Sequence, residues 1–330
     1  MMKRVMACLL ATLMLLSVLT ACAKNPEGIK GQDTQSTGST TYPSDTSTDP
    51  GVSQPIDPSS GETTPETVPD VTIPEETKPQ ETLPEIGTDP GGFGQIFSIE
   101  DLQGMDTTKK GYGPGTQVDG DNRPLGAVTL QEWYGEYDAY FIAPDNGDLY
   151  LTFDEGYENG YTTQILDVLK EKNVKAVFFV TLNYCKKNPA LIQRMIDEGH
   201  AVGNHSVSHL SMPTLSVEKM IDEVMVLHDY VVENFGYEMH LFRPPMGEYS
   251  KQSLAVLQYL GYKTVEWSFA YADYDPENQM DPDKAYAKVV GAAHGGGIFL
   301  LHAVSKTNTE ILGDVIDELR RQGYNLALFS

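Results

Sequence analysis

The stretch Leu-Tyr-Leu-Thr-Phe-Asp-Glu-Gly at residues 149–156 decides the fold of this chain. Its first five residues form a short apolar run that predicts a buried strand over residues 149–153. Two adjacent carboxylates, Asp154 and Glu155, follow that run directly. Two neighbouring carboxylates destabilise one another unless a cation or a proton separates their roles. The stretch therefore predicts a strand that ends in a chemically specialised site.

Further short apolar runs alternate with amphipathic segments along the rest of the chain. One helix is predicted to begin after Ser216, and another behind a Thr307-x-x-Glu310 capping box, with Gly323 as its stop. Strands alternating with helices predict an α/β fold, a distorted (β/α) barrel with about seven parallel strands. The six further strands are expected at residues 176–180, 201–203, 241–243, 264–267, 298–301 and 326–329.

Polar residues follow most of these strands, where barrels of this kind place their active sites. His205 and His209 follow the third strand. If that segment is helical, the four-residue spacing puts both imidazoles on one face, as for paired metal ligands. Two histidines and one carboxylate leave open positions for water and substrate on a divalent metal. Arg243 and Trp267 end the fourth and fifth predicted strands, and Asp273 and His302 follow the fifth and sixth.

Each feature alone has a plainer interpretation. A lone aspartate after a strand is often a helix cap, a His-x3-His pair is often structural, and Arg243-Pro244-Pro245 suits a turn. Taken together and in order, the features resemble the five motifs of the polysaccharide deacetylases, carbohydrate esterase family 4, over residues 149–330. The segments 150–162 and 300–306 resemble most the delta-lactam-biosynthetic branch, which acts on N-acetylmuramic acid in peptidoglycan.

This resemblance implies a role for each residue of the catalytic set. Asp154 would be the general base, held ionised by Arg243. His302 would be the general acid, oriented and kept charged by Asp273. His205 and His209 would bind a divalent metal, with zinc as the first choice.

The resemblance also implies how the acetyl group is held, and it leaves one position open. The backbone N–H of Met246 would stabilise the oxyanion, and Trp267 and Leu300 would line the acetate pocket. Glu155 departs from the family, where an Asp or, in the delta-lactam branch, an Asn stands. Its carboxylate could serve as third metal ligand, or it could point away and leave the two histidines with water.

The charge and the cysteines exclude several classes of protein. The 330 residues carry 23 Lys and Arg against 47 Asp and Glu, a net charge of −24, which argues against a nucleic-acid binder. The three cysteines, at positions 8, 22 and 185, do not support a disulfide framework. The resemblance described above implies a peptidoglycan glycan strand as the partner, and we expect a monomer.

The first 95 residues predict export and a tether. Residues 1–22 are predicted to be a lipoprotein signal peptide, because Lys3 and Arg4 precede an apolar run. The run ends in Leu19-Thr20-Ala21-Cys22, which is similar to a bacterial lipobox. Lipidation at Cys22 would anchor the protein to the outer face of the cytoplasmic membrane. An ordinary secretory signal with an incidental cysteine is the alternative.

Residues 23–95 are rich in Pro, Thr and Glu, which predicts a disordered linker. The alternative is a low-complexity tail whose length has no function. Residues 96–148 would form an N-terminal extension of the catalytic domain at 149–330.

The function that the resemblance implies is metal-dependent removal of the N-acetyl group from N-acetylmuramic acid, a step toward muramic delta-lactam in spore cortex. The alternatives are an N-acetylglucosamine deacetylase and a metal-free cell-wall-binding pseudoenzyme.

Overall fold

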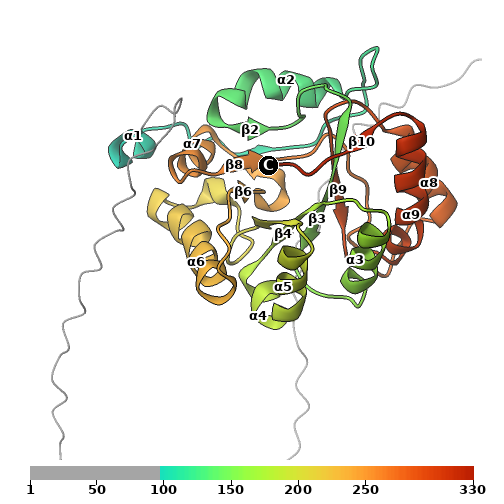
Figure 1. Ribbon diagram of the computed structural model, residues 1–330. Helices are drawn as coiled ribbons and strands as arrows, with labels where there is room; N and C mark the ends of the chain where they lie inside the picture. The colour runs from blue at the N-terminus through green and yellow to red at the C-terminus, as the bar shows by residue number, and fades with distance from the viewer. Residues whose placement is uncertain (1–96) are drawn as a thin grey trace, which may run out of the picture. The chain divides into compact units, whose positions relative to one another are not determined.

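The computed structural model describes residues 97–330, which form a curled parallel sheet with helices packed around its outside (Figure 1). The predicted signal peptide, the lipidation site Cys22 and the predicted linker lie outside the described residues. Within residues 97–330, no helix combines the length and the apolar character needed to cross a membrane.

All strand pairs of the main sheet are parallel, as the alternation of strands and helices predicted. The sheet has eight strands in the order β10-β3-β4-β5-β6-β8-β2, and β9 pairs with the other side of β3. The sequence did not predict β2. The strands are β2 (Ala139–Tyr140), β3 (Asp148–Glu155), β4 (Val177–Val180), β5 (Ala201–Asn204), β6 (Leu241–Phe242), β8 (Lys263–Val265), β9 (Gly297–His302) and β10 (Asn325–Leu326).

The sheet curls into a distorted barrel because the chain beyond β8 turns onto β9. A parallel bridge joins Phe269 to Phe299. The Ser268 N–H donates to the Ile298 carbonyl at 2.8 Å, and the Leu300 N–H donates to the Phe269 carbonyl at 2.9 Å. The α/β barrel predicted from the sequence is thereby confirmed, and the carboxyl ends of its strands converge at one side.

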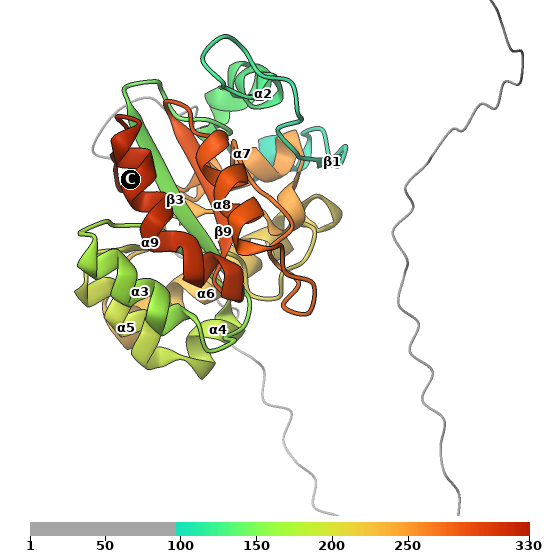
Figure 2. The same cartoon turned by 90° about the vertical axis from the view of Figure 1, so that its right-hand side faces the viewer.

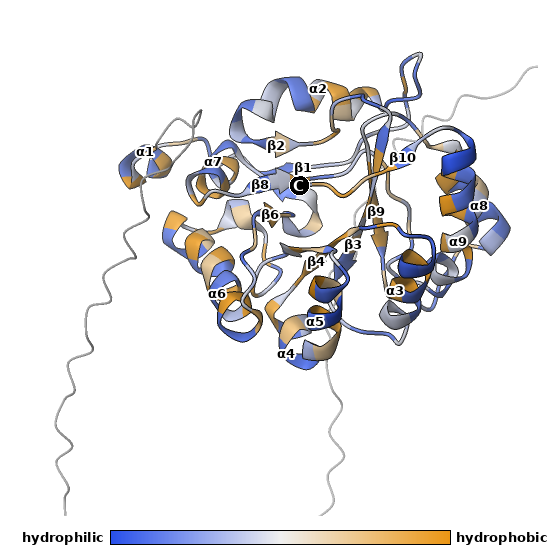
Figure 3. Ribbon diagram, viewed as in Figure 1, coloured by the Kyte–Doolittle hydropathy of each residue, from blue (hydrophilic) through white to orange (hydrophobic). Residues whose placement is uncertain are grey.

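Amphipathic helices bury their apolar faces against this sheet. Figure 3 shows hydrophobic and hydrophilic residues on each of them, and α8 and α9 lie over β3 and β9 in Figure 2. Phe153 and Phe178 stack at 5.2 Å in the core beneath the helices. The helices are α3 (Thr162–Glu171), α4 (Leu182–Lys187), α5 (Pro189–Asp197), α6 (Val217–Phe235), α7 (Lys251–Tyr259), α8 (Pro282–Gly291) and α9 (Lys306–Arg321).

One of the two predicted helix starts is confirmed and the other is wrong. Ser216 caps α6 by accepting a hydrogen bond from the Lys219 N–H at 3.4 Å. The cap of α9 is Ser305, whose hydroxyl accepts from the Asn308 N–H at 3.0 Å. Thr307 therefore lies inside the first turn, because the serine two residues earlier already satisfies the free N–H groups there.

The segment before β3 packs beside the sheet through short elements. It contains α1 (Ile99–Gln103), β1 (Lys110–Gly111), α2 (Leu125–Tyr134) and the 3₁₀ turn η1 (Gly135–Tyr137) before β2. β1 pairs antiparallel with β7 (Glu248–Tyr249), which follows the 3₁₀ turn η3 (Pro245–Gly247). A further 3₁₀ turn, η2 (Met212–Thr214), precedes α6. Pairing of β1 with β7 brings this segment to the edge of the strand-end region.

Candidate active site

Asp154 lies at the end of β3 and forms a buried ion pair with Arg243. The Arg243 Nη1 group donates to Asp154 Oδ1 at 2.8 Å, and the arginine is fully buried. Burial by itself would raise the pKa of Asp154, but the charges of Arg243 and then His205 outweigh it and hold the pKa low. Asp154 is therefore an ionised carboxylate whose second oxygen stays available to a ligand.

Arg243 is held in place by the backbone at the end of β8. Its Nε group donates to the Val265 carbonyl at 2.9 Å, and its Nη2 group donates to the Glu266 carbonyl at 3.0 Å. The guanidinium lies over the Phe179 ring at 4.2 Å from the centroid. These contacts on three sides explain how a full positive charge is tolerated at a buried position.

His302 lies beside Asp154, because the two residues are register partners on the neighbouring strands β9 and β3. The Nδ1 group of His302 donates to Asp273 Oδ1 at 2.7 Å, and the His302 backbone N–H donates to Asp273 Oδ2 at 2.9 Å. Burial lowers the pKa of His302, but the hydrogen bond and charge of Asp273 prevail, so that the pKa is raised overall. The Asp154 carboxylate and the His302 imidazole thus stand side by side at the strand ends.

Two residues that the sequence did not single out complete the support of Asp273. The Asn308 Nδ2 group, in the first turn of α9, donates to Asp273 Oδ2 at 2.6 Å, and the Tyr271 hydroxyl donates to Asn308 Oδ1. The proximity of Asn308 to His302, six residues earlier in the chain, was the only sequence signal for this contact. The network fixes Asp273, which in turn fixes the imidazole.

His205 and His209 come together in a loop rather than on a helix, so the helical interpretation of their spacing is wrong. Ser206 and His209 have φ angles of 70° and 55°, which a right-handed helix does not permit. This turn still brings the two rings to 4.8 Å between centroids. His205 Nε2 lies 3.5 Å from Asp154 Oδ2. The two imidazoles therefore share the strand-end site with Asp154.

The two histidines have the chemistry of metal ligands. His205 Nδ1 donates to the Arg243 carbonyl at 2.8 Å, which leaves the lone pair on Nε2 and orients the ring. Burial lowers the pKa of His205 to about 4 and lowers that of His209 as well, so both rings are neutral. Neutral imidazoles fit a divalent cation, and Asp154 is the carboxylate that lies beside His205.

Glu155 is not brought to the histidines. Its carboxyl group is fully buried, where Thr162 Oγ1 donates to it at 3.4 Å and its other oxygen has no hydrogen-bond partner. Burial raises its pKa well above the ordinary value, and the charge of Glu158 adds to this shift. No group of three or more His, Cys, Asp or Glu among residues 97–330 is arranged to hold a metal. A three-ligand site containing Glu155 does not fit this geometry.

The predicted acetate-pocket residues lie around the same strand ends. Met246 lies in the tight turn η3 with a φ of 60°, and its side chain is exposed. Gly247 follows at a φ of 61°, and a Cβ atom there would lie 2.6 Å from the Trp267 ring. Leu300 is buried in β9, two residues before His302. The structure therefore brings the turn and the Trp267 ring into direct contact.

Glu266 is a buried carboxyl that the sequence analysis did not single out. Both of its oxygens lack a hydrogen-bond partner, and burial raises its pKa to about 8, with Arg243 acting in the opposite direction. An acidic residue between Val265 and Trp267, inside an apolar strand, was the available signal. Because its own carbonyl accepts a hydrogen bond from Arg243, Glu266 is part of the surroundings of the site.

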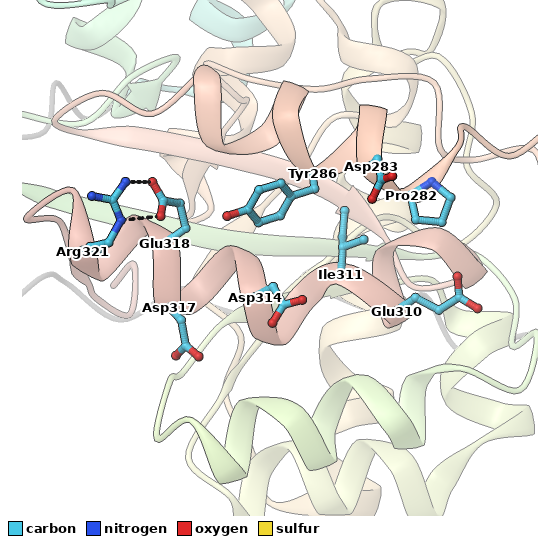
Figure 4. Close-up of a pocket in the computed structure, with 9 residues that line it drawn as sticks. All are labelled: Pro282, Asp283, Tyr286, Glu310, Ile311, Asp314, Asp317, Glu318 and Arg321. Carbon is cyan, nitrogen blue, oxygen red and sulfur yellow. Dashed lines mark hydrogen bonds and ion pairs between the residues drawn. The ribbon is translucent and has the colours of Figure 1, made fainter.

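The cavity between α8 and α9, about 550 Å³ in volume, contains none of these residues (Figure 4). Four of its nine lining residues are carboxylates of α9, and Arg321 pairs with Glu318 at 2.6 Å. Tyr286 and Ile311 form its apolar part. Because no reactive strand-end group reaches it, the chemistry of this protein is assigned to the strand ends.

Comparison with known proteins agrees with the class of enzyme that these strand ends indicate. The model of the polysaccharide deacetylase family matches residues 142–265. The peptidoglycan-N-acetylmuramic acid deacetylase PdaA of Bacillus subtilis is 44% identical over 203 residues, which cover 61% of this chain and 77% of that protein. The peptidoglycan-N-acetylglucosamine deacetylase PgdA of Listeria monocytogenes is 34% identical over 182 residues, 55% of this chain and 38% of that protein.

A solved structure gives the same result. The structure of B. subtilis PdaA, described as a family 4 carbohydrate esterase, superposes with a TM-score of 0.64 at 38% identity and covers 68% of this chain and 96% of that chain. This chain belongs to the polysaccharide deacetylase family. It is an enzyme of the deacetylase class, and the family resemblance of the strand-end motifs is confirmed.

Proposed function

We propose that this protein removes the N-acetyl group from N-acetylmuramic acid residues of peptidoglycan. The observation that carries the proposal is the register pairing of Asp154 with His302, each with its own buried partner. Hydrolysis of an amide needs a base for water and an acid for the leaving nitrogen. The relative PdaA, which is 44% identical to this chain, carries this sugar in its name.

In the proposed reaction each residue has one task. Asp154 takes a proton from the attacking water, and His302, kept charged by Asp273, gives a proton to the nitrogen as the C–N bond breaks. The products are acetate and a free amine. The Met246 N–H would stabilise the oxyanion, while Trp267 and Leu300 would line the acetate pocket.

We further propose that His205 and His209 hold a divalent cation, with zinc as the ion that best suits neutral imidazoles. When bound, such a cation polarises the acetyl carbonyl. The free amine on muramic acid is the group that a later ring closure would use to form muramic delta-lactam in spore cortex. Lipidation at Cys22 would anchor the monomeric enzyme to the outer face of the cytoplasmic membrane, within reach of the glycan strands.

A second candidate substrate is N-acetylglucosamine, which the 34%-identical PgdA carries in its name. The same acid and base would serve either sugar. The pseudoenzyme alternative is disfavoured by the complete set of Asp154, Arg243, Asp273 and His302, because a binding module gains nothing from an acid, a base and their supports.

The experiment is acetate release from intact and peptide-stripped peptidoglycan, with and without added zinc. Mass spectrometry of the digested glycan identifies the deacetylated sugar. We expect acetate and free muramic amines in equal amounts, and a loss of about 10² to 10⁴ in turnover for Asp154→Asn. Free glucosamine amines would favour the second candidate. No acetate from either substrate with zinc present would contradict the proposal.

A further inference from the structure

Tyr112, in the segment before β2, bridges two backbone segments that line the strand-end site. Its backbone N–H donates to the Gly247 carbonyl at 2.9 Å. Its hydroxyl donates to the Trp267 carbonyl at 2.5 Å. Gly247 belongs to the turn that contains Met246, so one residue connects that turn to the Trp267 segment.

The position of Tyr112 is itself fixed from several directions. It follows β1 directly, whose residues Lys110 and Gly111 pair with β7. Its ring packs against Phe141 at 4.9 Å and against Trp267 at 5.2 Å between centroids. A half-buried side chain with these neighbours has little rotational freedom, so its hydroxyl can hold a backbone carbonyl in place.

The segment that Tyr112 holds is the same segment that holds Arg243. Three consecutive carbonyls, those of residues 265, 266 and 267, all accept side-chain hydrogen bonds. The first two accept from Arg243 and the third accepts from Tyr112. Since Arg243 donates to Asp154, movement of this segment would move the carboxylate proposed as the base.

Close packing also couples the Trp267 ring to the turn at Met246. A Cβ atom on Gly247 would lie 2.6 Å from the ring, so the ring occupies the space that only a glycine leaves free. A shift of Trp267 would therefore be transmitted to the turn, and through it to the N–H of Met246.

We propose that Tyr112 is a positioning residue of the deacetylation site. It fixes Trp267 and the Met246 turn relative to Arg243 and Asp154, and it thereby acts on turnover more than on substrate binding. The inference rests on the proposed function of the strand-end site, and it adds a residue that lies before the segment matched by the family.

The first test is Tyr112→Phe, which removes the hydroxyl and keeps the ring. We expect kcat for acetate release to fall about 3- to 10-fold, the range that corresponds to loss of one neutral hydrogen bond, with KM within twofold. Tyr134→Phe is the matched control, since Tyr134 lies in the same aromatic cluster, 6.1 Å from Phe141 between ring centroids. Rates are compared per folded protein, measured by near-ultraviolet circular dichroism.

A second test needs no substrate. The chain has two tryptophans, and Trp133 is exposed on α2, so Trp133→Phe leaves Trp267 as the only tryptophan. In that background, Tyr112→Phe should increase acrylamide quenching of Trp267 fluorescence at least 1.5-fold, whereas Tyr134→Phe should not.

Equal kcat for the two tyrosine variants, or equal quenching, overturns the positioning role. A wild-type protein that releases no acetate overturns the proposed function and the turnover role together. The quenching comparison still reports whether Tyr112 holds Trp267, so the two failures can be told apart.

Discussion

Asp154 and Glu155 are neighbours in sequence with different surroundings, because successive side chains of a strand point to opposite faces. Asp154 meets Arg243 and His205, whereas Glu155 enters a buried space beside Thr162. A fully buried carboxyl without a nearby cation is disfavoured in its charged form, which is why the pKa of Glu155 is raised. The two carboxyl groups therefore serve different purposes in spite of their adjacency.

This orientation predicts that Glu155→Gln leaves the affinity for divalent zinc unchanged. An amide has nearly the shape of a protonated carboxyl group, so the buried site should accept it without moving the histidines. His209→Ala should lower the affinity at least tenfold, because even outer contacts of metal sites contribute that much. Competition with a chromogenic chelator measures both values.

The control for the metal titration is His240→Ala, since the His240 side chain is 68% exposed and lies outside the strand-end site. It should bind zinc as the wild type does. A tenfold loss of affinity in Glu155→Gln would restore Glu155 as a ligand and would show that the carboxylate turns toward the histidines when the metal is bound.

At the scale of elements, the short connection from β9 to α9 assembles the surroundings of His302. His302 is the last residue of β9, Ser305 caps α9, and Asn308 lies in its first turn. Asn308 donates to Asp273 while its backbone N–H donates to Ser305. The helix start therefore holds the carboxylate that accepts a hydrogen bond from the His302 ring, so the cap of α9 and the support of His302 depend on the same few residues.

The raised pKa of His302 predicts the alkaline limb of the pH profile. A general acid must be protonated, so kcat/KM should fall as the pH rises through the pKa of His302. Asp273→Asn removes the charge that raises this pKa, so the decline should begin at lower pH than in the wild type. Turnover at the optimum should also fall, by up to about 10⁴, as for the orienting residue of a catalytic triad.

Asp275→Asn is the control for the pH experiment, because Asp275 is an exposed carboxylate two residues further along the same loop. Its profile should match that of the wild type. An unchanged alkaline limb in Asp273→Asn would mean that His302 is not the group that titrates there.

At the scale of the whole molecule, residues 97–148 add one strand, β2, to the same sheet as the strands that follow it. β2 pairs with β8, and the Ala143 N–H donates to the Gly296 carbonyl at 2.9 Å. β1 pairs with β7, which directly follows the turn that contains Met246. The walls of the site therefore depend on residues 97–148, which contain none of the five family motifs.

Membrane anchoring is predicted from residues 1–22. Cys22→Ala should move the protein from the membrane fraction to the soluble fraction, because the thiol that would carry the lipid is lost. Cys8→Ala, within the apolar run of the predicted signal peptide, should leave it in the membrane fraction. Fractionation followed by mass spectrometry of the mature N-terminus checks both. A Cys22→Ala protein that stays in the membrane would contradict lipidation at this residue.

The sequence by itself determined the parallel α/β barrel and the residues that meet at its strand ends. Strand and helix patterns are local, and parallel strands bring their carboxyl ends to one side, so Asp154, His205, Arg243 and His302 could be placed together without coordinates. The lengths of the strands and the true cap of α9 were less predictable, because neighbouring residues compete for the same backbone groups.

Only the tertiary structure decided which way Glu155 points, and that Tyr112, Asn308 and Glu266 surround the site. Each of these depends on contacts between segments far apart in the chain: Tyr112 meets Trp267 across 155 residues, and Asn308 meets Asp273 across 35. Periodicity along a sequence carries no information about such pairings. These contacts form when the whole sheet packs, because packing decides which buried side chains lie next to one another. The protonation state of each buried group then depends on its neighbours.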